Sequence, residues 1–212
     1  MSFPKCVEYY TSTPIGIIIS FHGGCFSGGN MSYDKEQNNL LSNMGFIVYQ
    51  PEFPKKYSEF KKWCQEYIPS FQKRNLTVYV LGRSSGGYLA KYVYKNYLFI
   101  NGAIYLCPIL FPKERYQHIS KFQSKTMSFF DEEEENMSVL NNNEFMILST
   151  IDENIPYQLF DKVIGGHIYY DSTMSHTEVL KCCDERIKNF IEDFCKEICV
   201  TRRKTSIQMF LK

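Results

Sequence analysis

Short runs of apolar residues alternate along the chain with segments in which apolar residues recur every three or four positions. The short runs are rich in Ile, Val, Leu, Phe and Tyr, which is typical of strands covered on both faces of a parallel sheet. These predicted strands are residues 15–21, 46–50, 76–81, 102–107, 145–150 and 167–170. The segments with helical spacing predict helices over residues 32–44, 57–71, 88–94, 156–164 and 177–199.

This alternation predicts the α/β class. Right-handed strand–helix–strand units build a mostly parallel sheet with helices on both faces, and we expect about six strands, with Val7–Tyr10 as a candidate edge strand. The loops at residues 22–30, 82–87 and 150–156 each follow a strand. They should therefore meet at the edge of the sheet where proteins of this class bind ligands.

Two helix predictions carry further detail. In the helix over residues 32–44, Leu40, Leu41 and Met44 form the expected inward face, and Gly45 is placed to end the helix. Pro69 should disturb the end of the following helix.

The composition narrows the class of protein. A chain of 212 residues suits one domain over residues 1–212, and its 44% hydrophobic residues can fill a core. The formal net charge of +1 predicts no binding to nucleic acid. No apolar run approaches the ~20 residues that a membrane span needs, and residues 1–8 lack an export signal. We therefore expect a cytoplasmic protein, whose oligomeric state the sequence leaves open.

The eight cysteines are expected to be reduced, since no export signal accompanies them. Cys182 and Cys183 lie ~20 Å from Cys195 and Cys199 along one predicted helix, at 1.5 Å per residue, so the four cannot converge on one zinc ion. We predict no metal site and no other cofactor.

Two segments fall outside the regular pattern. Residues 108–143 hold two prolines, the acidic run Asp131–Glu135 and three asparagines, and are predicted to be a small insert or a short cap over a site. We expect the acidic run to be a solvated loop or helix end, because like charges repel. Residues 200–212 form a basic tail.

The strongest chemical signal is a serine between a predicted strand and a predicted helix. The strand runs into Gly82-Arg83-Ser84-Ser85-Gly86-Gly87, and the helix follows at once. So sharp a turn leaves no room for side chains, which explains Gly82 and Gly86. This G-x-S-x-G arrangement is typical of a nucleophile elbow, which exposes the serine Oγ on a strained turn. Ser84 is the candidate nucleophile.

A serine hydroxyl needs a base to remove its proton during attack. Of the four histidines, His22 is better placed to brace the glycine loop that follows it, His118 lies in the irregular segment, and His167 starts a strand. His176 lies between the last predicted strand and the last helix. We predict His176 as the general base, with capping of that helix as its alternative role.

Asp152, just after the strand over residues 145–150, is the predicted acid that fixes the tautomer of His176. The order Ser84, Asp152, His176 is the order of triads on this class of sheet. Capping of a helix is the alternative role of Asp152.

Acyl transfer also needs donors for the developing oxyanion. The N–H of Ser85 at the helix start is one candidate, and the loop His22-Gly23-Gly24-Cys25 offers Gly23, Gly24 and Cys25. A phosphate cradle is the competing interpretation, but neither G-x-x-x-x-G-K-[ST] nor G-x-G-x-x-G is present.

With these residues the chain resembles the α/β-hydrolases, specifically the esterases and lipases with a His-Gly-Gly motif (hormone-sensitive-lipase-like enzymes and related carboxylesterases). The resemblance spans residues 15–198 and rests on His22-Gly23-Gly24, Gly82–Gly87, Asp152 with Pro156, and His176. It implies an α/β-hydrolase fold with a minimal cap. It also implies that Ser84, His176 and Asp152 form a triad, with Gly23, Gly24 and Ser85 as oxyanion-hole donors. The third glycine of the family motif is Cys25 here.

The leading hypothesis is therefore a serine hydrolase that cleaves a carboxylic ester of a small-molecule acyl substrate through an acyl-enzyme on Ser84. The same triad would serve an amidase, a formamidase or a serine peptidase. A third possibility is a non-catalytic binding protein that shares the fold.

Overall fold

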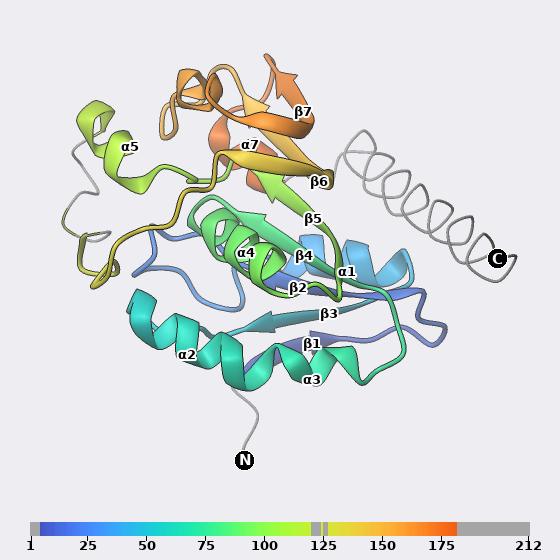
Figure 1. The fold of residues 1–212 in the computed structure, drawn as a ribbon. Helices are drawn as coiled ribbons and strands as arrows, with labels where there is room; N and C mark the ends of the chain where they lie inside the picture. The colour runs from blue at the N-terminus through green and yellow to red at the C-terminus, as the bar shows by residue number, and fades with distance from the viewer. Residues whose placement is uncertain (1–4, 120–123, 125–126, 182–212) are drawn as a thin grey trace, which may run out of the picture.

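The computed structural model describes residues 5–119, 124 and 127–181 (Figure 1). Its centre is a sheet of seven strands in the order β1-β3-β2-β4-β5-β6-β7. The strands are β1 (Cys6–Tyr9), β2 (Gly16–Phe21), β3 (Phe46–Pro51), β4 (Val78–Arg83), β5 (Ile100–Leu106), β6 (Val139–Ser149) and β7 (Ile164–Asp171). All neighbouring pairs are parallel except β1 and β3. The predicted α/β class and mostly parallel sheet are confirmed, with β1 as the edge strand.

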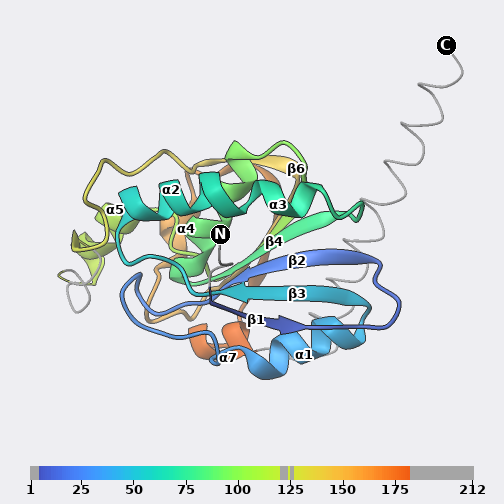
Figure 2. The same cartoon turned by 90° about the horizontal axis from the view of Figure 1, so that it is seen from below.

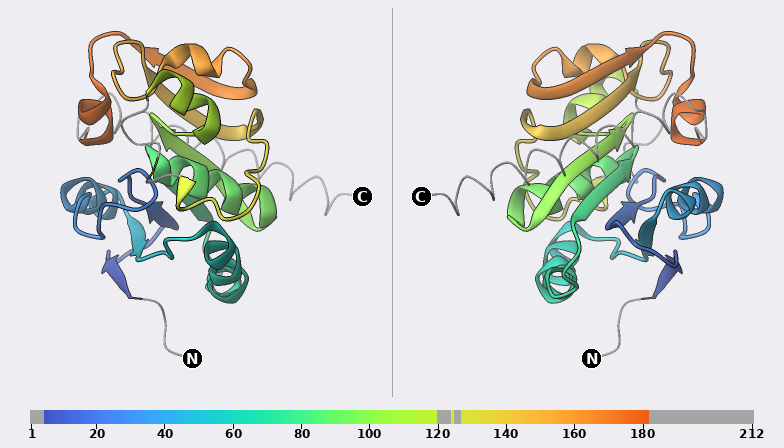
Figure 3. Two further views of the ribbon diagram at one scale, coloured as in Figure 1. Left: turned by 90° about the vertical axis from the view of Figure 1, so that its left-hand side faces the viewer. Right: turned by 90° about the vertical axis from the view of Figure 1, so that its right-hand side faces the viewer.

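Helices cover both faces of this sheet. One face carries α1 (Lys35–Asn43) and α7 (His176–Lys181), and the other carries α2 (Tyr57–Tyr67), α3 (Pro69–Gln72) and α4 (Ser85–Asn96) (Figure 2). Views along the strands show α1 and α2 on opposite sides (Figure 3). Two shorter elements, α5 (Pro112–His118) and the 3₁₀-helix η2 (Tyr157–Phe160), follow β5 and β6. No helix in the described part of the chain is both long and apolar enough to span a bilayer.

The core has two parts, one on each side of the sheet. Side chains alternate along a strand, so Ile17 and Ile19 of β2 pack on the side of α2 and α4. Ile18, between them, packs with Leu41 of α1 and Val179 of α7. Both faces of β2 are fully buried, which explains its continuous apolar sequence.

The strand order in the sheet changes sides at β2. From β2 it passes to β3 on one side, and from β3 it crosses back to β4 on the other side of β2. The carboxyl ends of β2 and β4 therefore flank a topological switch point, where the crevice of such a sheet opens. The loops that begin at His22 and Ser84 border this point.

Several predicted boundaries were wrong. The strand predicted over residues 145–150 begins at Val139, and the helix predicted over residues 156–164 is only the short η2. The predicted break at Pro69 is confirmed, since α2 ends and α3 begins there. The helix predicted to reach residue 199 is described only to Lys181, so the rest of it, Cys182, Cys183, Cys195, Cys199 and the tail at residues 200–212 lie outside the described residues.

The acidic run is a loop, as predicted, with Asp131, Glu132 and Glu133 exposed and Glu134 and Glu135 partly buried. Asp131 accepts hydrogen bonds from the backbone N–H and the hydroxyl of Ser58 at the start of α2. Glu135 pairs with Lys95 of α4 at 2.7 Å, and Glu134 is half-buried, so desolvation raises its pKa. These contacts tie the run to the body of the protein, which offsets the repulsion between neighbouring carboxylates.

A buried ion pair joins α4 to the middle of β6. Lys91 Nζ lies 2.6 and 2.8 Å from the two carboxylate oxygens of Glu144, and both side chains are almost completely buried. Tyr105 and the N–H of Asn141 also donate to Glu144, and Lys91 donates to the carbonyl of Val139. This satisfied network extends β6 beyond its apolar residues to Val139, which explains why the predicted strand was too short.

We expect Lys91→Met to lower the free energy of unfolding by about 3–5 kcal/mol, because the buried Glu144 carboxylate loses its partner. Lys95→Met removes the half-exposed partner of Glu135 and should cost only about 0–1 kcal/mol. Urea unfolding of both variants tests the difference. Equal costs for the two variants would contradict this account of the buried pair.

Candidate active site

Five adjacent strands bring the candidate functional residues to one edge of the sheet. β2 ends at the glycine loop, residues 22–29, and β4 ends beside Ser84. β5, β6 and β7 lead into Cys107, Asp152 and His176. Because β2, β4, β5, β6 and β7 are parallel neighbours, their carboxyl ends lie along the same edge.

Ser84 occupies a strained turn between β4 and α4, with φ 50° and ψ −119°. Its N–H donates to the carbonyl of Leu106 on β5 at 3.0 Å. Its carbonyl accepts from the N–H groups of Gly87 and Ile109 at 2.9 Å each. These bonds hold the turn from both sides, and the predicted strand–turn–helix geometry is confirmed.

Glycine is required on either side of the turn. A Cβ on Gly82 would lie 2.4 Å from the carbonyl oxygen of Gly86. A Cβ on Gly86 would lie 2.2 Å from the carbonyl oxygen of Phe21 and 2.6 Å from that of His22. β2 therefore approaches the start of α4 so closely that only a residue without a side chain fits.

Ser84, His176 and Asp152 form a continuous chain of contacts. His176 Nε2 lies 3.2 Å from Ser84 Oγ, and His176 Nδ1 lies 2.6 Å from Asp152 Oδ2. A carboxylate only accepts, so Nδ1 carries the proton and Nε2 can accept the serine proton. The structure thus brings together the three residues that the sequence predicted as nucleophile, base and acid.

His176 is the first residue of α7, and its loop is held on both sides. Ser175 and Glu178 form a capping box. The N–H of Ser175 donates to the carboxylate of Glu178, and the N–H of Glu178 donates to Ser175 Oγ. Asp171 Oδ1 accepts from the N–H groups of Thr173 and Met174, which fixes the turn that leads from β7 into this loop. The sequence S-x-x-E at Ser175 was a signal for this helix start.

The two carboxylate oxygens of Asp152 have different roles. Oδ2 contacts His176, whereas Oδ1 accepts from the N–H groups of Asn154 and Ile155 at 2.7 and 2.8 Å. Oδ1 thus fixes the loop that follows Asp152. The helix-capping role that the sequence left open for Asp152 is wrong, since η2 begins only at Tyr157 and its N-cap is Pro156. The neighbouring Glu153 is exposed.

The glycine loop is braced by His22, as predicted. His22 is buried and stacks on Phe53 with ring centroids 4.6 Å apart, and burial lowers its pKa. Its Nδ1 lies 2.7 Å from the carbonyl oxygen of Gly23, so Nδ1 donates. Because C=O and the next N–H point in opposite directions across a trans peptide, the N–H of Gly24 faces away from the His22 ring.

A buried polar network holds the turn from the other face of the sheet. Arg83 donates to Ser20 Oγ at 2.8 Å and lies 3.6 Å from the carboxylate of Asp34. Gln50 donates to Asp34 at 2.9 Å and accepts from Asn38 at 2.6 Å.

The network corrects the predicted inward face of α1. That face consists of Gln37, Asn38, Leu41 and Ser42. Leu40 and Met44, which were predicted to point inward, are only partly buried. Polar residues are favoured there because the buried guanidinium of Arg83 needs hydrogen-bond acceptors nearby.

A cavity of about 470 Å³ opens at Ser84 and His176. Gly23, Gly24 and Cys25 of the glycine loop line it. Ser85 is buried at the start of α4, where backbone N–H groups lack helical partners. The structure therefore places three candidate oxyanion donors, Gly23, Gly24 and Cys25, at the same cavity as Ser84, whereas Ser85 is not among the lining residues.

The cavity also has walls that the sequence did not predict. They come from the residues just before α1, from α5 and from α7, and include Tyr33, Asp34, Arg115, Thr177 and Lys181. Arg115 lies in the segment predicted as an insert or cap, and no local motif distinguishes it from the other basic residues there. Neither His118 nor His167 lines this cavity.

One group of metal-ligating side chains lies close together in the described part of the chain. An atom each of Cys107, Asp152 and His176 lie within 4.8 Å of one another. Burial raises the pKa of Cys107, which disfavours the thiolate that a metal needs. The 2.6 Å contact between Asp152 and His176 has the length of a charge-assisted hydrogen bond. These features fit a proton between the two groups better than a metal ion.

Solved structures share this architecture at low sequence identity. An acetyl ester-xyloside bifunctional hydrolase from Caldicellulosiruptor lactoaceticus is 16% identical, with a TM-score of 0.63 over 88% of each chain. An α/β-hydrolase enzyme from a lagoon-sediment metagenome of Mar Chica, Morocco, is also 16% identical, with a TM-score of 0.64 over 91% of this chain and 94% of that one. The chain has the α/β-hydrolase fold.

Esterases are among the neighbours with this hydrolase fold. Est2 from Thermogutta terrifontis, solved with propionate bound, is 14% identical, with a TM-score of 0.65 over 91% of this chain and 89% of that one. No protein-family model and no curated protein matches the sequence. At such identities the likeness establishes the fold alone.

We expect Gly86→Ala to lower the free energy of unfolding by at least about 3 kcal/mol, because its Cβ meets two backbone carbonyls that cannot move aside. Gly23→Ala is the matched control. Its Cβ would lie 3.2 Å from Ser84 Cβ, and it should cost about 1 kcal/mol or less. Thermal unfolding compares the two, and a Gly86→Ala protein as stable as Gly23→Ala would refute the close approach.

Proposed function

We propose that this protein is a serine hydrolase that cleaves carboxylic esters through an acyl-enzyme on Ser84. The observation that carries the proposal is the chain of contacts Asp152–His176–Ser84, with distances of 2.6 and 3.2 Å, at the wall of a cavity. A serine hydroxyl becomes an effective nucleophile only beside such a base.

In the proposed reaction Ser84 Oγ attacks the ester carbonyl while His176 Nε2 takes its proton. The carbonyl oxygen becomes an oxyanion, and the N–H of Ser85 at the start of α4 is the first candidate donor to it. The N–H groups of Gly23, Gly24 and Cys25 are the further candidate donors. Removal of one such donor typically costs roughly 10²–10³-fold in rate.

Collapse of this intermediate expels the alcohol, which receives the proton from His176. Water then attacks the acyl-enzyme, with His176 again as the base, and releases the acid and free Ser84. Asp152 keeps Nδ1 protonated throughout, so Nε2 is always the nitrogen that faces Ser84.

The structural neighbours support a small acyl substrate. Esterase B from Lactobacillus rhamnosis was solved inhibited by a tributyrin phosphonate, and Est2 with propionate bound. A cavity of about 470 Å³ is of a size that takes small-molecule ligands. We therefore propose short-chain esters as the class of substrate.

We expect a fluorophosphonate probe to label the wild-type protein and not Ser84→Ala, because the probe reacts only with an activated serine. Ser85→Ala is the matched control. It keeps the backbone N–H and removes a buried hydroxyl that has no hydrogen-bond partner, so labelling should persist. In-gel fluorescence and intact mass measure the adduct.

A folded wild-type protein that stays unlabelled would refute the proposal and favour a non-catalytic binding protein. If labelling occurs, a panel of 4-nitrophenyl esters, aryl amides and N-formyl compounds distinguishes an esterase from an amidase or formamidase. Faster turnover of an amide or formyl compound than of any ester would overturn the ester assignment.

We expect Asp152→Asn to lower kcat by roughly 10³–10⁴-fold with little loss of stability. The amide oxygen of Asn can still accept from Asn154 and Ile155, whereas the negative charge beside His176 is lost. Asp152→Ala loses both functions, so its melting temperature should fall as well. Ester hydrolysis together with thermal unfolding separates the two effects, and an active Asp152→Asn protein would exclude Asp152 as the acid.

A further inference from the structure

The walls of the Ser84 cavity carry more positive than negative charge. Arg115 of α5 and Lys181 of α7 line it, and Asp34 is the acidic residue among the lining side chains that the structure describes. The three residues come from the N-cap of α1, from α5 and from α7, so the charge depends on how the fold brings these elements together.

The carboxylate of Asp34 contacts two buried polar residues that do not line the cavity. Its Oδ2 accepts from Gln50 Nε2 at 2.9 Å and lies 3.6 Å from the guanidinium of Arg83. Asp34 therefore offsets the buried charge of Arg83, and the cations of the cavity keep most of their electrostatic effect.

Arg115 is rigidly placed. Its side chain is only 1% exposed, and its Nε donates to the carbonyl of Asn154 at 2.7 Å. The N–H of Asn154 in turn donates to Asp152 Oδ1. One loop thus anchors both the carboxylate that orients His176 and the guanidinium that lines the cavity.

An arginine held in this way suits a carboxylate. Its guanidinium stays charged, and its planar fork of donors matches the two oxygens of a carboxylate. An ion pair at a water-poor cavity wall is also stronger than the same pair in bulk water.

We infer that the substrate carries a carboxylate besides its scissile ester, and that Arg115 binds this carboxylate while Ser84 attacks the ester. This inference rests on the proposed function. The substrate class is then a small half-ester of a dicarboxylic acid, or an ester whose alcohol part bears the carboxylate. Both present the same anion to Arg115, and matched substrates distinguish them.

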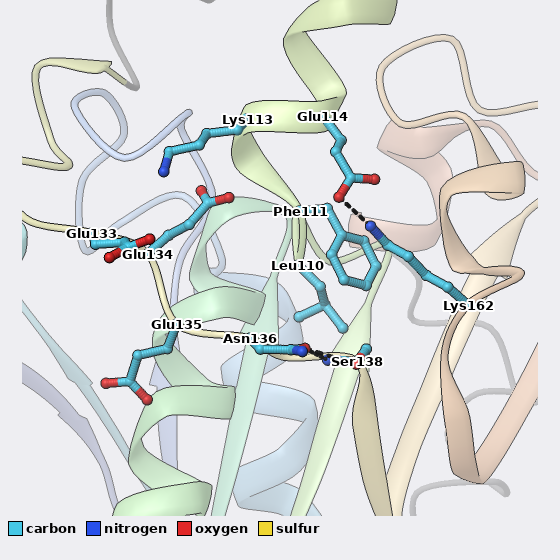
Figure 4. A pocket seen from close by; sticks show the side chains of 10 residues that line it. All are labelled: Leu110, Phe111, Lys113, Glu114, Glu133, Glu134, Glu135, Asn136, Ser138 and Lys162. Carbon is cyan, nitrogen blue, oxygen red and sulfur yellow. Dashed lines mark hydrogen bonds and ion pairs between the residues drawn. The ribbon is translucent and has the colours of Figure 1, made fainter.

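A second cavity, of about 310 Å³, is lined by Lys113 and Glu114 of α5 and by residues of the acidic run (Figure 4). Glu114 of this helix pairs there with Lys162, and Lys113 lies near Glu134 of the acidic run. Lys113 does not line the Ser84 cavity. It is therefore a matched control for Arg115, since it is a cation of the same helix that lines the second cavity.

The test compares kcat/KM for two substrate pairs, after subtraction of uncatalysed hydrolysis. One pair is mono-4-nitrophenyl adipate and 4-nitrophenyl hexanoate, which differ by a carboxylate on the acyl side. The other pair is 4-acetoxybenzoate and its methyl ester, which differ by a carboxylate on the alcohol side. We expect wild type to prefer the anionic member of one pair by about tenfold or more.

Arg115→Met should lower the ratio of kcat/KM for the preferred anionic ester to that for its neutral partner by about 10–100-fold, whatever it does to both substrates through the loop of Asp152. Arg115→Lys should retain part of the preference, and Lys113→Met should leave it unchanged. Because Arg115 is buried, circular dichroism of each variant accompanies the kinetics.

A measurement on the unaltered protein covers the case in which Arg115→Met does not fold. Free adipate should slow fluorophosphonate labelling of wild type more than adipamide does, and high salt should reduce this protection.

The outcomes separate the two proposals. Labelling and ester turnover without preference for either anion, and without protection by adipate, would overturn the anion inference and leave the hydrolase proposal standing. A protein that stays unlabelled would refute the hydrolase proposal, and adipate-dependent thermal stabilisation of the folded protein would then still report anion binding.

Discussion

The backbone at Ser84 must turn from strand to helix within one residue, and this constraint organises the centre of the fold. The turn is possible because Gly82 and Gly86 carry no side chains and because β2 packs against the start of α4 at van der Waals distance. It is stable because Leu106 and Ile109 bond the backbone of Ser84 from the neighbouring strand and the loop after it. These hydrogen bonds together offset the free-energy cost of the strained φ at Ser84.

The same constraint explains the polar layer beneath α1. Successive residues of a strand face opposite sides of the sheet, so Arg83, which precedes Ser84, lies in a buried position beside Ser20 and Asp34. A charge there requires partners, and Ser20 and Asp34 provide them. α1 is therefore anchored by polar contacts as well as by Leu41. One wall of the cavity is consequently tied to the residue that precedes the candidate nucleophile.

Sequence patterns predicted most of the fold and the residues that meet at the centre of the candidate site, for a physical reason. Buried parallel strands need continuous apolar runs, and an elbow needs its glycines, so Gly82-x-Ser84-x-Gly86 and the order of Asp152 and His176 are local signals. What the patterns missed depends on distant partners. Glu144 is buried in a strand beside its partner Lys91, and Arg115 lines the cavity while its Nε donates to the carbonyl of Asn154. No local periodicity encodes such pairs.

The segment after β5 links the two sides of the cavity. It begins at Cys107, beside Asp152, and contributes Arg115 to the wall. Further along, Phe129 and Phe130 pack on Phe26 of the glycine loop with ring centroids 5.0 Å apart. A change in this segment would therefore act on the charge of the cavity and on the position of the glycine loop together. The sheet edge presents the reactive groups, whereas this segment shapes the space in which a substrate would meet them. Variation of substrate preference within this architecture is accordingly expected to concentrate here, where side chains can change without disturbing the turn at Ser84.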